Sequence, residues 1–544
     1  MIKQRMMKIK MNTWGWKQVI YILALMAHAG SLLGQQPIRS ELFENFRETK
    51  SQSLLPDFSY AGYHTGEKGI PDIDNYQVFN VIDFGAIPND SISDRNAIQA
   101  AIDAANKNGS GIVFFPKGRF IVNDDSTSQT GIVSKGSNII LRGSGSGADG
   151  TELFMKETLE PENPKHMWTG RPMFTMTAEG SDQVVGKVAT PAAIGDIELT
   201  LEGIGNLQVG DWIALKMLDN DAELVAKELI PHRLDKAWRK LEEKGVGVCM
   251  YYEIVNINKN TIRLHAPLAY TVNPKYDWTV YNFSYADEVG IENIAFVGNW
   301  KKEFVHHRSW KDDSGFNLLE LVHCTNSWIR NCRFTDCSIA AFVRQSANIT
   351  VINSLVNGNG GHHAITSVHS TNVLLANLKD EASQWHSFGV SNRAINTVIW
   401  NCTYPSTTCF ESHADQPRST LLDNVTGGFM TGRQGGAKWS MPNHHSGLVI
   451  WNYTQTSKAI KNFDFWPNDD VWFKMSPPLI AGFRSEGTTF REGNLAYLEG
   501  LGQVVSPQSL YEGQLELRLG KTPLWLIEAK AQNRGLVYEV AKTE

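Results

Sequence analysis

The sequence has 544 residues, enough for one large elongated domain or for two to three domains of ordinary size. Its 51 Lys and Arg residues against 57 Asp and Glu residues give a formal net charge of −6, so nucleic acid is not an expected partner. An acidic polysaccharide would have to be held by a local basic cleft.

The N-terminus predicts a signal peptide over residues 1–34. Basic residues precede an apolar stretch at 19–29, and small residues follow it. This stretch is shorter than the roughly 20 residues of a membrane-spanning helix, and no later segment offers a membrane span. We therefore expect a mature protein that is secreted or periplasmic, with residues 35–75 as an N-terminal extension.

Residues 76–122 predict a strand, a turn, an amphipathic helix at 96–107 and a second strand. The segments FNVIDFGAIPND and DRNAIQAAIDAANKNGSGIVFFPKGRFIV in this region resemble the N-terminal signature of the pectate-lyase superfamily. The resemblance implies an all-β fold, a right-handed parallel β-helix, with an activity on polysaccharides. The helix is expected to cap the open end of the solenoid, where strand edges would otherwise be unpaired.

Residues 189–272 interrupt the pattern with short β-segments around a charged helical stretch. They predict a small inserted β/helical segment beside the axis of the solenoid. Its charged residues are expected to form a solvated face.

Repeats dominate the chain from residue 327 onward. The segments IRNCRF, VINSLV, LANLKD, IWNCTY, LDNVTG and IWNYTQ align on six asparagines at nearly regular intervals: Asn331, Asn353, Asn377, Asn401, Asn424 and Asn452. Each unit has short strands around an Asn, which tolerates a left-handed turn and can bond its counterpart in the next coil. The regular spacing predicts a parallel β-helix over 76–460, followed by C-terminal coils and a helical cap over 461–544.

The six cysteines lack metal-ligand spacing. Cys332 and Cys402 each follow a repeat Asn and are expected to share an interior column. We predict buried free thiols rather than disulfides, because Cys is among the most buried residue types.

Candidate site residues concentrate between His306 and His445, which bound ten of the 15 histidines. Four side chains follow the Asn of their own coil at nearly the same distance along the chain, and equivalent positions of a parallel solenoid stack at about 4.8 Å. We expect them to form one surface column: His363, His386, Glu411 and Arg433. Around this column we expect Arg393, His413, Arg418, Lys438 and His444, with Trp385 and Trp439 to stack on sugars.

This composition favours β-elimination of a uronate-containing glycan. The reaction removes the C5 proton, neutralises the adjacent carboxylate and releases the leaving oxygen. We expect His386 or His413 to be the base, and Glu411 to orient His413 or hold a cation. The expected cations beside the carboxylate are Arg393, Arg418 and Arg433. The expected substrate-binding residues are His363, Trp385, Lys438, Trp439 and His444.

The segments DEASQWHSFGVS, CFESHADQPRSTLLDN and GRQGGAKWSMPNHHSGLVIWNY also resemble bacterial β-helix proteins, some of which are polysaccharide lyases, including chondroitin-type enzymes. That resemblance implies a glycosaminoglycan such as chondroitin sulfate or hyaluronan. The basic and acidic pattern of the best-known pectate lyases is not seen, so their calcium-dependent mechanism is not carried over.

Two alternatives remain. A glycoside hydrolase on the same fold needs two carboxyl groups about 5–9.5 Å apart, for which Asp380, Glu381, Glu411 and Asp415 are candidates. A glycan-binding protein without catalysis would need aromatic platforms and few titratable groups. The excess of His and Arg favours the lyase.

A metal cofactor is not fixed by the sequence. Ca2+ remains open, because carboxylates that suit it are present at Asp312 and Asp313 and at Glu411 and Asp415. Zinc is not expected, because the members of the adjacent pairs His362–His363 and His444–His445 should point in opposite directions on a strand.

Overall fold

The computed structural model describes residues 36–49, 52–430, 432–469 and 472–540. The predicted signal peptide lies outside these residues. Within them, no helix is long and apolar enough to cross a bilayer.

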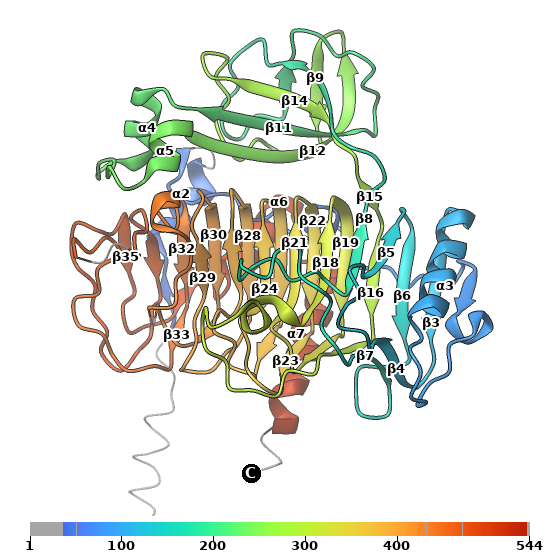
Figure 1. Ribbon diagram of the computed structural model, residues 1–544. Helices are drawn as coiled ribbons and strands as arrows, with labels where there is room; N and C mark the ends of the chain where they lie inside the picture. The colour runs from blue at the N-terminus through green and yellow to red at the C-terminus, as the bar shows by residue number, and fades with distance from the viewer. Residues whose placement is uncertain (1–35, 50–51, 431, 470–471, 541–544) are drawn as a thin grey trace, which may run out of the picture.

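Most of the chain forms a stack of coils with three long parallel sheets along its sides (Figure 1). The thirteen-stranded sheet contains, in spatial order, β2 (Val78–Asn80), β3 (Gly111–Phe115), β6 (Ile139–Gly143), β16 (Gly290–Glu292), β19 (Cys324–Arg330), β22 (Ala347–Ile352), β25 (Thr371–Ala376), β28 (Ile395–Trp400), β30 (Arg418–Asp423), β32 (Leu448–Trp451), β34 (Leu479–Ala481) and β35 (Tyr497–Glu499), with β15 (Ala286–Asp287) beside β19. The predicted parallel β-helix is therefore present; its right-handed winding stays a prediction.

Two further sheets complete the coils. The seven-stranded sheet contains β5 (Ile132–Lys135), β8 (Phe174–Thr177), β18 (Asn317–Val322), β21 (Ile339–Arg344), β24 (His363–Val368), β27 (Gly389–Ser391) and β29 (Glu411–His413). The six-stranded sheet contains β4 (Gly118–Asn123), β7 (Thr151–Met155), β17 (Ala295–Val297), β20 (Arg333–Thr335), β23 (Leu355–Asn357) and β26 (Lys379–Asp380), and β31 (Thr426–Gly427) pairs with β33 (Thr454–Gln455). Apolar side chains from all three sheets fill the interior.

The six repeat asparagines adopt the predicted left-handed conformation, with φ between 48° and 56°. Among them, Asn377 donates to the side chain of Asn353 at 3.0 Å. A second Asn column, which the sequence analysis missed, forms an unbroken ladder along the thirteen-stranded sheet: Asn326, Asn348, Asn372 and Asn396, joined at 3.1, 3.2 and 2.6 Å. The six cysteines are buried and free, as predicted.

The inserted segment forms a separate antiparallel sheet that lies across the coils (Figure 1). It spans 183–282, a wider range than the expected 189–272. Its elements are β9 (Gln183–Lys187), β10 (Glu198–Thr200), β11 (Trp212–Asp219), α4 (Ala222–Leu229), α5 (Arg239–Lys244), β12 (Val246–Asn258), β13 (Thr261–Leu264) and β14 (Trp278–Asn282). Its apolar core includes Ile395, Ala414 and Met441 of the coils, so the insertion is packed onto the β-helix.

Helices lie at one end and along one side of the stack. Helix α3 (Arg95–Asn108) appears at the predicted position, buries Ile98 and Ile102, and lies at the N-terminal end of the coils in Figure 1. Short helical turns are η2 (Tyr63–Gly66), η3 (Val81–Phe84), η4 (Lys311–Gly315) and η5 (Lys438–Ser440).

The expected C-terminal cap is wrong in its position. Helices α6 (Leu510–Leu519) and α7 (Leu524–Val540) share an apolar cluster with Trp400 and Trp451 on the outer face of the thirteen-stranded sheet. Helix α2 (Glu41–Thr49) joins the same cluster, and β1 (Ile38–Arg39) pairs with β36 (Val505–Ser506). The helices cover this face because its large apolar side chains would otherwise be exposed.

Candidate active site

Two histidines stack on the seven-stranded sheet. His363 begins β24, and a parallel bridge joins it to His386 in the next coil. Their ring centroids lie 4.8 Å apart. This stacking is the one that the equal spacing from the repeat asparagines predicts.

Glu411 is not the third member of that column, because its register partner in the preceding coil is Gly389. Its carboxylate nevertheless reaches both histidines, with Oε2 3.3 Å from Nδ1 of His363 and Oε1 3.4 Å from Nδ1 of His386. A Cβ atom at position 389 would lie only 2.6 Å from the carbonyl oxygen of Glu411. A glycine there leaves room for the strand that carries the carboxylate.

His413 completes a carboxylate–imidazole pair. Its Nδ1 lies 2.6 Å from Oε1 of Glu411, and its side chain is 39% exposed while that of Glu411 is fully buried. Burial lowers the pKa of His413, but Glu411 outweighs it and the net pKa is raised. Burial likewise raises the pKa of Glu411, but His386 and His413 outweigh it and the net pKa is lowered. The carboxylate therefore holds the Nδ1 proton and leaves Nε2 available for proton transfer.

Three other histidines of the site are harder to protonate than a free imidazole. Burial lowers the pKa of His362, His363 and His386 well below the usual value. His386 is 1% exposed and its Nδ1 donates to the carbonyl oxygen of Arg433 at 2.8 Å. Of the two histidines predicted as the base, only His413 is accessible to a polymer.

A loop between β17 and β18 brings a further histidine to the site. The backbone N–H and ring of His307 bind the Asp313 carboxylate at 3.0 and 2.6 Å, which fixes the loop. The preceding residue, His306, stacks its ring on Trp385 with centroids 5.0 Å apart. Sequence reasoning missed this residue; the only signal was its place in a His-rich segment.

His362 and His363 lie on the same side of the sheet, with ring centroids 4.1 Å apart. The expectation that they point in opposite directions is wrong, because His362 precedes β24 and strand alternation does not apply to it. The argument against zinc fails with it. In the described part of the chain, three groups of side chains could hold a metal ion, because the ligand atoms within each group lie within 4.8 Å of one another. The groups are His306–His362–His386, His306–His307–Asp313 and His363–Glu411–His413.

Arginines border the site on two sides. The Arg433 guanidinium lies 4.3 Å from the centre of the Trp385 ring, so this Trp is partly covered and is not a free sugar platform. Arg344, which sequence reasoning missed, occupies the same register column as His413 on the seven-stranded sheet. Its Nε donates to Glu320 at 3.1 Å, and its side chain is 33% exposed. Arg344 is thus a partly exposed cation that is already paired with Glu320 and lies three coils from His413.

Two predicted site residues are buried elsewhere. Arg418 is 2% exposed and binds Glu228 at 2.9 Å and the carbonyl oxygen of Gly247 at 2.9 Å, so it holds the insertion and does not contact substrate. His444 is fully buried, and its Nε2 bonds the Thr420 hydroxyl at 2.9 Å. Neither side chain is accessible to substrate: the partner of Arg418 lies on the insertion, far away in the sequence, whereas His444 bonds a residue of the adjacent coil.

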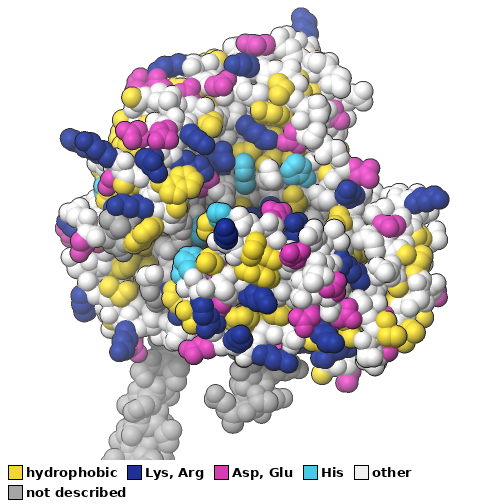
Figure 2. Space-filling view, viewed as in Figure 1, with side chains coloured by type: hydrophobic (Ala, Val, Ile, Leu, Met, Phe, Trp, Pro, Cys, Tyr) yellow, Lys and Arg dark blue, Asp and Glu magenta, His cyan; other side chains and the backbone are white. Residues whose placement is uncertain are grey.

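Three other predicted site residues lie beside the insertion. Arg393 lines a cavity of about 240 Å³ between the insertion and the coils, together with Lys216 and His369. Lys438 is exposed, and Trp439 is 47% exposed beside the ammonium of Lys240 at 5.5 Å. Figure 2 shows histidine side chains in the hollow between the insertion and the β-helix. Arg393 and Trp439 therefore contact the insertion.

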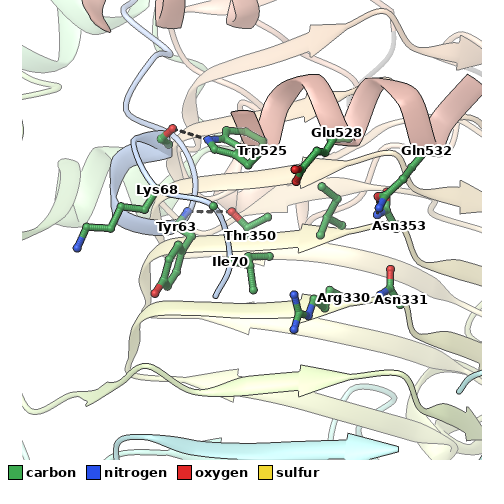
Figure 3. A pocket seen from close by; sticks show the side chains of 14 residues that line it. Tyr63, Lys68, Ile70, Arg330, Asn331, Thr350, Asn353, Trp525, Glu528 and Gln532 are labelled. Atoms are coloured by element: carbon green, nitrogen blue, oxygen red, sulfur yellow. Dashed lines mark hydrogen bonds between the residues drawn. The ribbon is translucent and has the colours of Figure 1, made fainter. Parts of the chain in front are cut away.

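A separate cavity of about 150 Å³ lies on the outer face of the thirteen-stranded sheet (Figure 3). Tyr63 donates its backbone N–H to Thr350 at 2.8 Å, and Trp525 of α7 donates to the carbonyl oxygen of Gly66 at 2.9 Å. The cavity marks where both terminal segments join the coils. None of the predicted site residues lines it.

Two family models match parts of the chain. The model described as "Rhamnogalacturonase A/epimerase, pectate lyase-like" matches residues 78–179, which include the predicted signature segment. The model described as "Domain of unknown function (DUF4955)" matches residues 383–529, which include His386, Glu411 and His413. The predicted pectate-lyase-like character is thereby confirmed for the N-terminal coils, whereas a chondroitin-type specificity is not shown.

Curated relatives match over a short segment. Alginate lyase 7 and mannuronan C5-epimerase AlgE3 of Azotobacter vinelandii are each 42% identical over 69 residues, which is 13% of this chain. The match covers 8% of the lyase and 4% of the epimerase.

Solved structures match over most of the chain with low identity. The tailspike protein gp49 of Pseudomonas phage LKA1 has a TM-score of 0.48 and 14% identity, over 74% of this chain and 62% of that one. An exopolygalacturonase of Thermotoga maritima has a TM-score of 0.35 and 12% identity, over 87% and 98%. The A-module of mannuronan C-5 epimerase AlgE4 of Azotobacter vinelandii has a TM-score of 0.35 and 14% identity, over 78% and 90%. At these identities the likeness concerns the fold alone.

Proposed function

We propose that this protein is a secreted polysaccharide lyase that cleaves a uronate-containing glycan by β-elimination. The observation that carries the proposal is the Glu411–His413 pair, in which a buried carboxylate orients a partly exposed imidazole. The names of the curated relatives, an alginate lyase and a mannuronan C5-epimerase, support an enzyme that acts on a uronan. Elimination and C5 epimerisation of a uronate both begin with removal of the C5 proton.

In the proposed mechanism His413 removes the C5 proton through Nε2. Its Nδ1–H remains on Glu411, and the carboxylate stabilises the imidazolium that forms. Arg344, three coils from His413 in the same register column, binds a carboxylate of the polymer and helps to hold the substrate chain. The C4–O bond then breaks, a C4–C5 double bond forms, and the leaving oxygen takes a proton from water in the groove.

The hydrolase alternative has less support. A hydrolase needs two carboxyl groups that reach the sugar, and Glu411 is fully buried among imidazoles. Asp380 is 1% exposed, and burial raises its pKa to about 7. Asp415 pairs with Lys240 at 2.5 Å. Glu381, the remaining candidate, is 43% exposed and pairs with Lys379.

The proposal is tested by ultraviolet absorbance during incubation with chondroitin sulfate, hyaluronan, alginate and pectate. The lyase gives rising absorbance, from its conjugated double bond, with at least one polymer. The polymer that reacts identifies the uronate; the sequence resemblance favours a glycosaminoglycan and the curated relatives favour alginate. New reducing ends without absorbance would replace the lyase with the hydrolase, and neither signal would leave a binding protein.

A further inference from the structure

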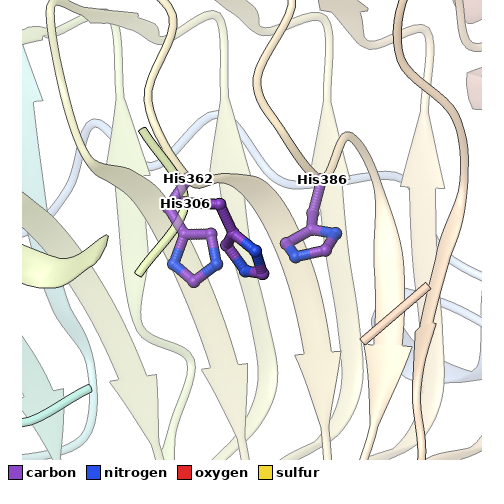
Figure 4. A group of neighbouring side chains, drawn as sticks. All are labelled: His306, His362 and His386. Carbon is purple, nitrogen blue, oxygen red and sulfur yellow. The ribbon is translucent and has the colours of Figure 1, made fainter. Parts of the chain in front are cut away.

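Three imidazoles converge beside the catalytic pair. His306 comes from the loop between β17 and β18, and His362 and His386 come from the turns before β24 and β27 (Figure 4). One ring nitrogen of each lies within 4.8 Å of the others. Ring centroids are separated by 5.0 Å for His362 and His386, 5.3 Å for His306 and His362, and 5.7 Å for His306 and His386.

The hydrogen bonds fix the tautomer of the two buried rings. Nδ1 of His362 lies 2.9 Å from the carbonyl oxygen of Asp313, and Nδ1 of His386 lies 2.8 Å from that of Arg433. A carbonyl oxygen only accepts, so Nδ1 carries the proton in both rings and Nε2 carries a lone pair.

Those two lone pairs have no partner. Nε2 of His362 and Nε2 of His386 are buried and make no hydrogen bond, although the two side chains are 7% and 1% exposed. Buried acceptors are normally satisfied, and a ring that donates Nδ1–H to a carbonyl while Nε2 is free is the usual arrangement of a metal-binding histidine.

The geometry points to a metal site formed by His306, His362 and His386, specific for a first-row transition metal such as Zn2+. Three imidazoles without a carboxylate suit zinc or its neighbours and not Ca2+, which takes oxygen ligands. Zn–N bonds of about 2.0–2.1 Å in a tetrahedron place the nitrogens about 3.3 Å apart. The rings therefore close by roughly an ångström when the metal binds.

The neighbouring groups fit a metal less well. In the group of His363, Glu411 and His413, the Nδ1 atom of His413 already donates to Glu411 at 2.6 Å. In the group that contains His307, the ring nitrogen is held by Asp313 at 2.6 Å. Nδ1 of His363 and Oε2 of Glu411 are also buried without a hydrogen bond, but the Glu411 carboxylate is already engaged by His413, whereas the tautomers of His362 and His386 are fixed by backbone carbonyls.

Three protein ligands leave one coordination position open, which is typical of a metal that binds substrate. The ring of His386 lies 6.2 Å from that of His413, so a sugar carboxylate on the metal would be close to the base. This role rests on the proposed function; the binding of the metal does not.

The test measures metal directly. The full-length protein is stripped with a chelator and titrated calorimetrically with ZnCl2, and the Co2+ form is examined for the absorption bands of tetrahedral cobalt. We expect one zinc per chain for the wild type. His306→Ala is the main variant, because its side chain lies on a surface loop and its removal leaves the coils intact. It should weaken zinc binding by at least about 100-fold.

His166→Ala, at an exposed position outside the three-histidine group, is the matched control and should bind zinc as the wild type does. His413→Ala should also keep the zinc while losing elimination, which separates failure of the metal site from failure of the proposed function. His362→Ala is a second ligand variant, with its thermal melting recorded. Wild-type protein that takes up no zinc, or a His306→Ala variant that binds it unchanged, would overturn the inference.

Discussion

The buried pair between Glu228 of α4 and Arg418 of β30 should determine how firmly the insertion is held on the coils. Glu228 is 11% exposed and Arg418 2%, and their atoms are 2.9 Å apart. We choose Glu228→Gln, which keeps the shape of the side chain and removes its charge. The variant leaves the Arg418 guanidinium buried with two neutral acceptors, the Gln amide oxygen and the Gly247 carbonyl, and no negative partner.

The magnitude follows from the pKa of Glu228. Burial by itself raises that pKa, but Arg418 and His445 lower it by more than burial raises it. The net pKa falls from 4.5 to about 2. This depression corresponds to about 3 kcal/mol, at the lower end of the cost of breaking a buried pair. Because the folded-state pKa is depressed, the contribution is complete above the unfolded value near 4.5 and is lost as the pH falls through about 2.

The assay is urea denaturation at pH 7 and at several lower pH values. Glu228→Gln should lower the free energy of unfolding by about 3 kcal/mol at pH 7, and the difference from the wild type should shrink as the pH falls below about 4.5. Glu223→Gln on the same helix is the control, because Glu223 is 83% exposed and its loss should cost less than about 0.5 kcal/mol.

The double variant Glu228→Gln/Arg418→Met should recover part of the loss, since it removes the unpaired charge. A single-variant cost below about 1 kcal/mol, or a difference that does not depend on pH, would refute the reasoning. Arg418→Met that abolishes elimination while leaving stability unchanged would restore the original catalytic interpretation of this residue.

Three further predictions concern the site and the ladder. His413→Ala should lower kcat on the reactive polymer about 10²–10⁴-fold with the fold intact by circular dichroism, and His166→Ala should not. Arg344→Met should raise KM about 10-fold, because the substrate loses a hydrogen bond to a charged group. A larger effect on kcat than on KM would instead place Arg344 at the reacting atoms. Asn372→Ala should cost about 3 kcal/mol in urea, from two lost ladder bonds and a left-handed backbone. Asn372→Gly should cost less, and equal costs would exclude the backbone contribution.

The coils could be predicted because each unit repeats the same pattern of short strands around an Asn. A residue such as Asn353 or Cys332 has its role fixed by its position in the unit, and the neighbouring coils supply identical surroundings. The stacking of His363 on His386 followed from the same count. The second Asn ladder recurs as regularly as the first, but its members lie inside β19, β22, β25 and β28, where an Asn is not a turn signal.

The candidate site was only partly predictable, since its outcome depends on segments that leave the repeat. The loop that brings His306 over the sheet has no periodicity. Arg393 and Arg418 were predicted to contact substrate. Both instead contact the insertion, and these contacts could not be foreseen because the insertion is far from them in the sequence. Glu411 was placed in the right cluster and in the wrong column, because coils of unequal length shift the register on this sheet.

The crosswise attachment of the insertion limits how this protein can change in evolution. A solenoid ordinarily tolerates the gain or loss of a whole coil, because each coil contacts only its neighbours. Here Glu228 reaches Arg418, His306 reaches His386, and β1 pairs with β36. One additional coil between these points would displace the partners by about 4.8 Å. The number of coils between these points is therefore fixed.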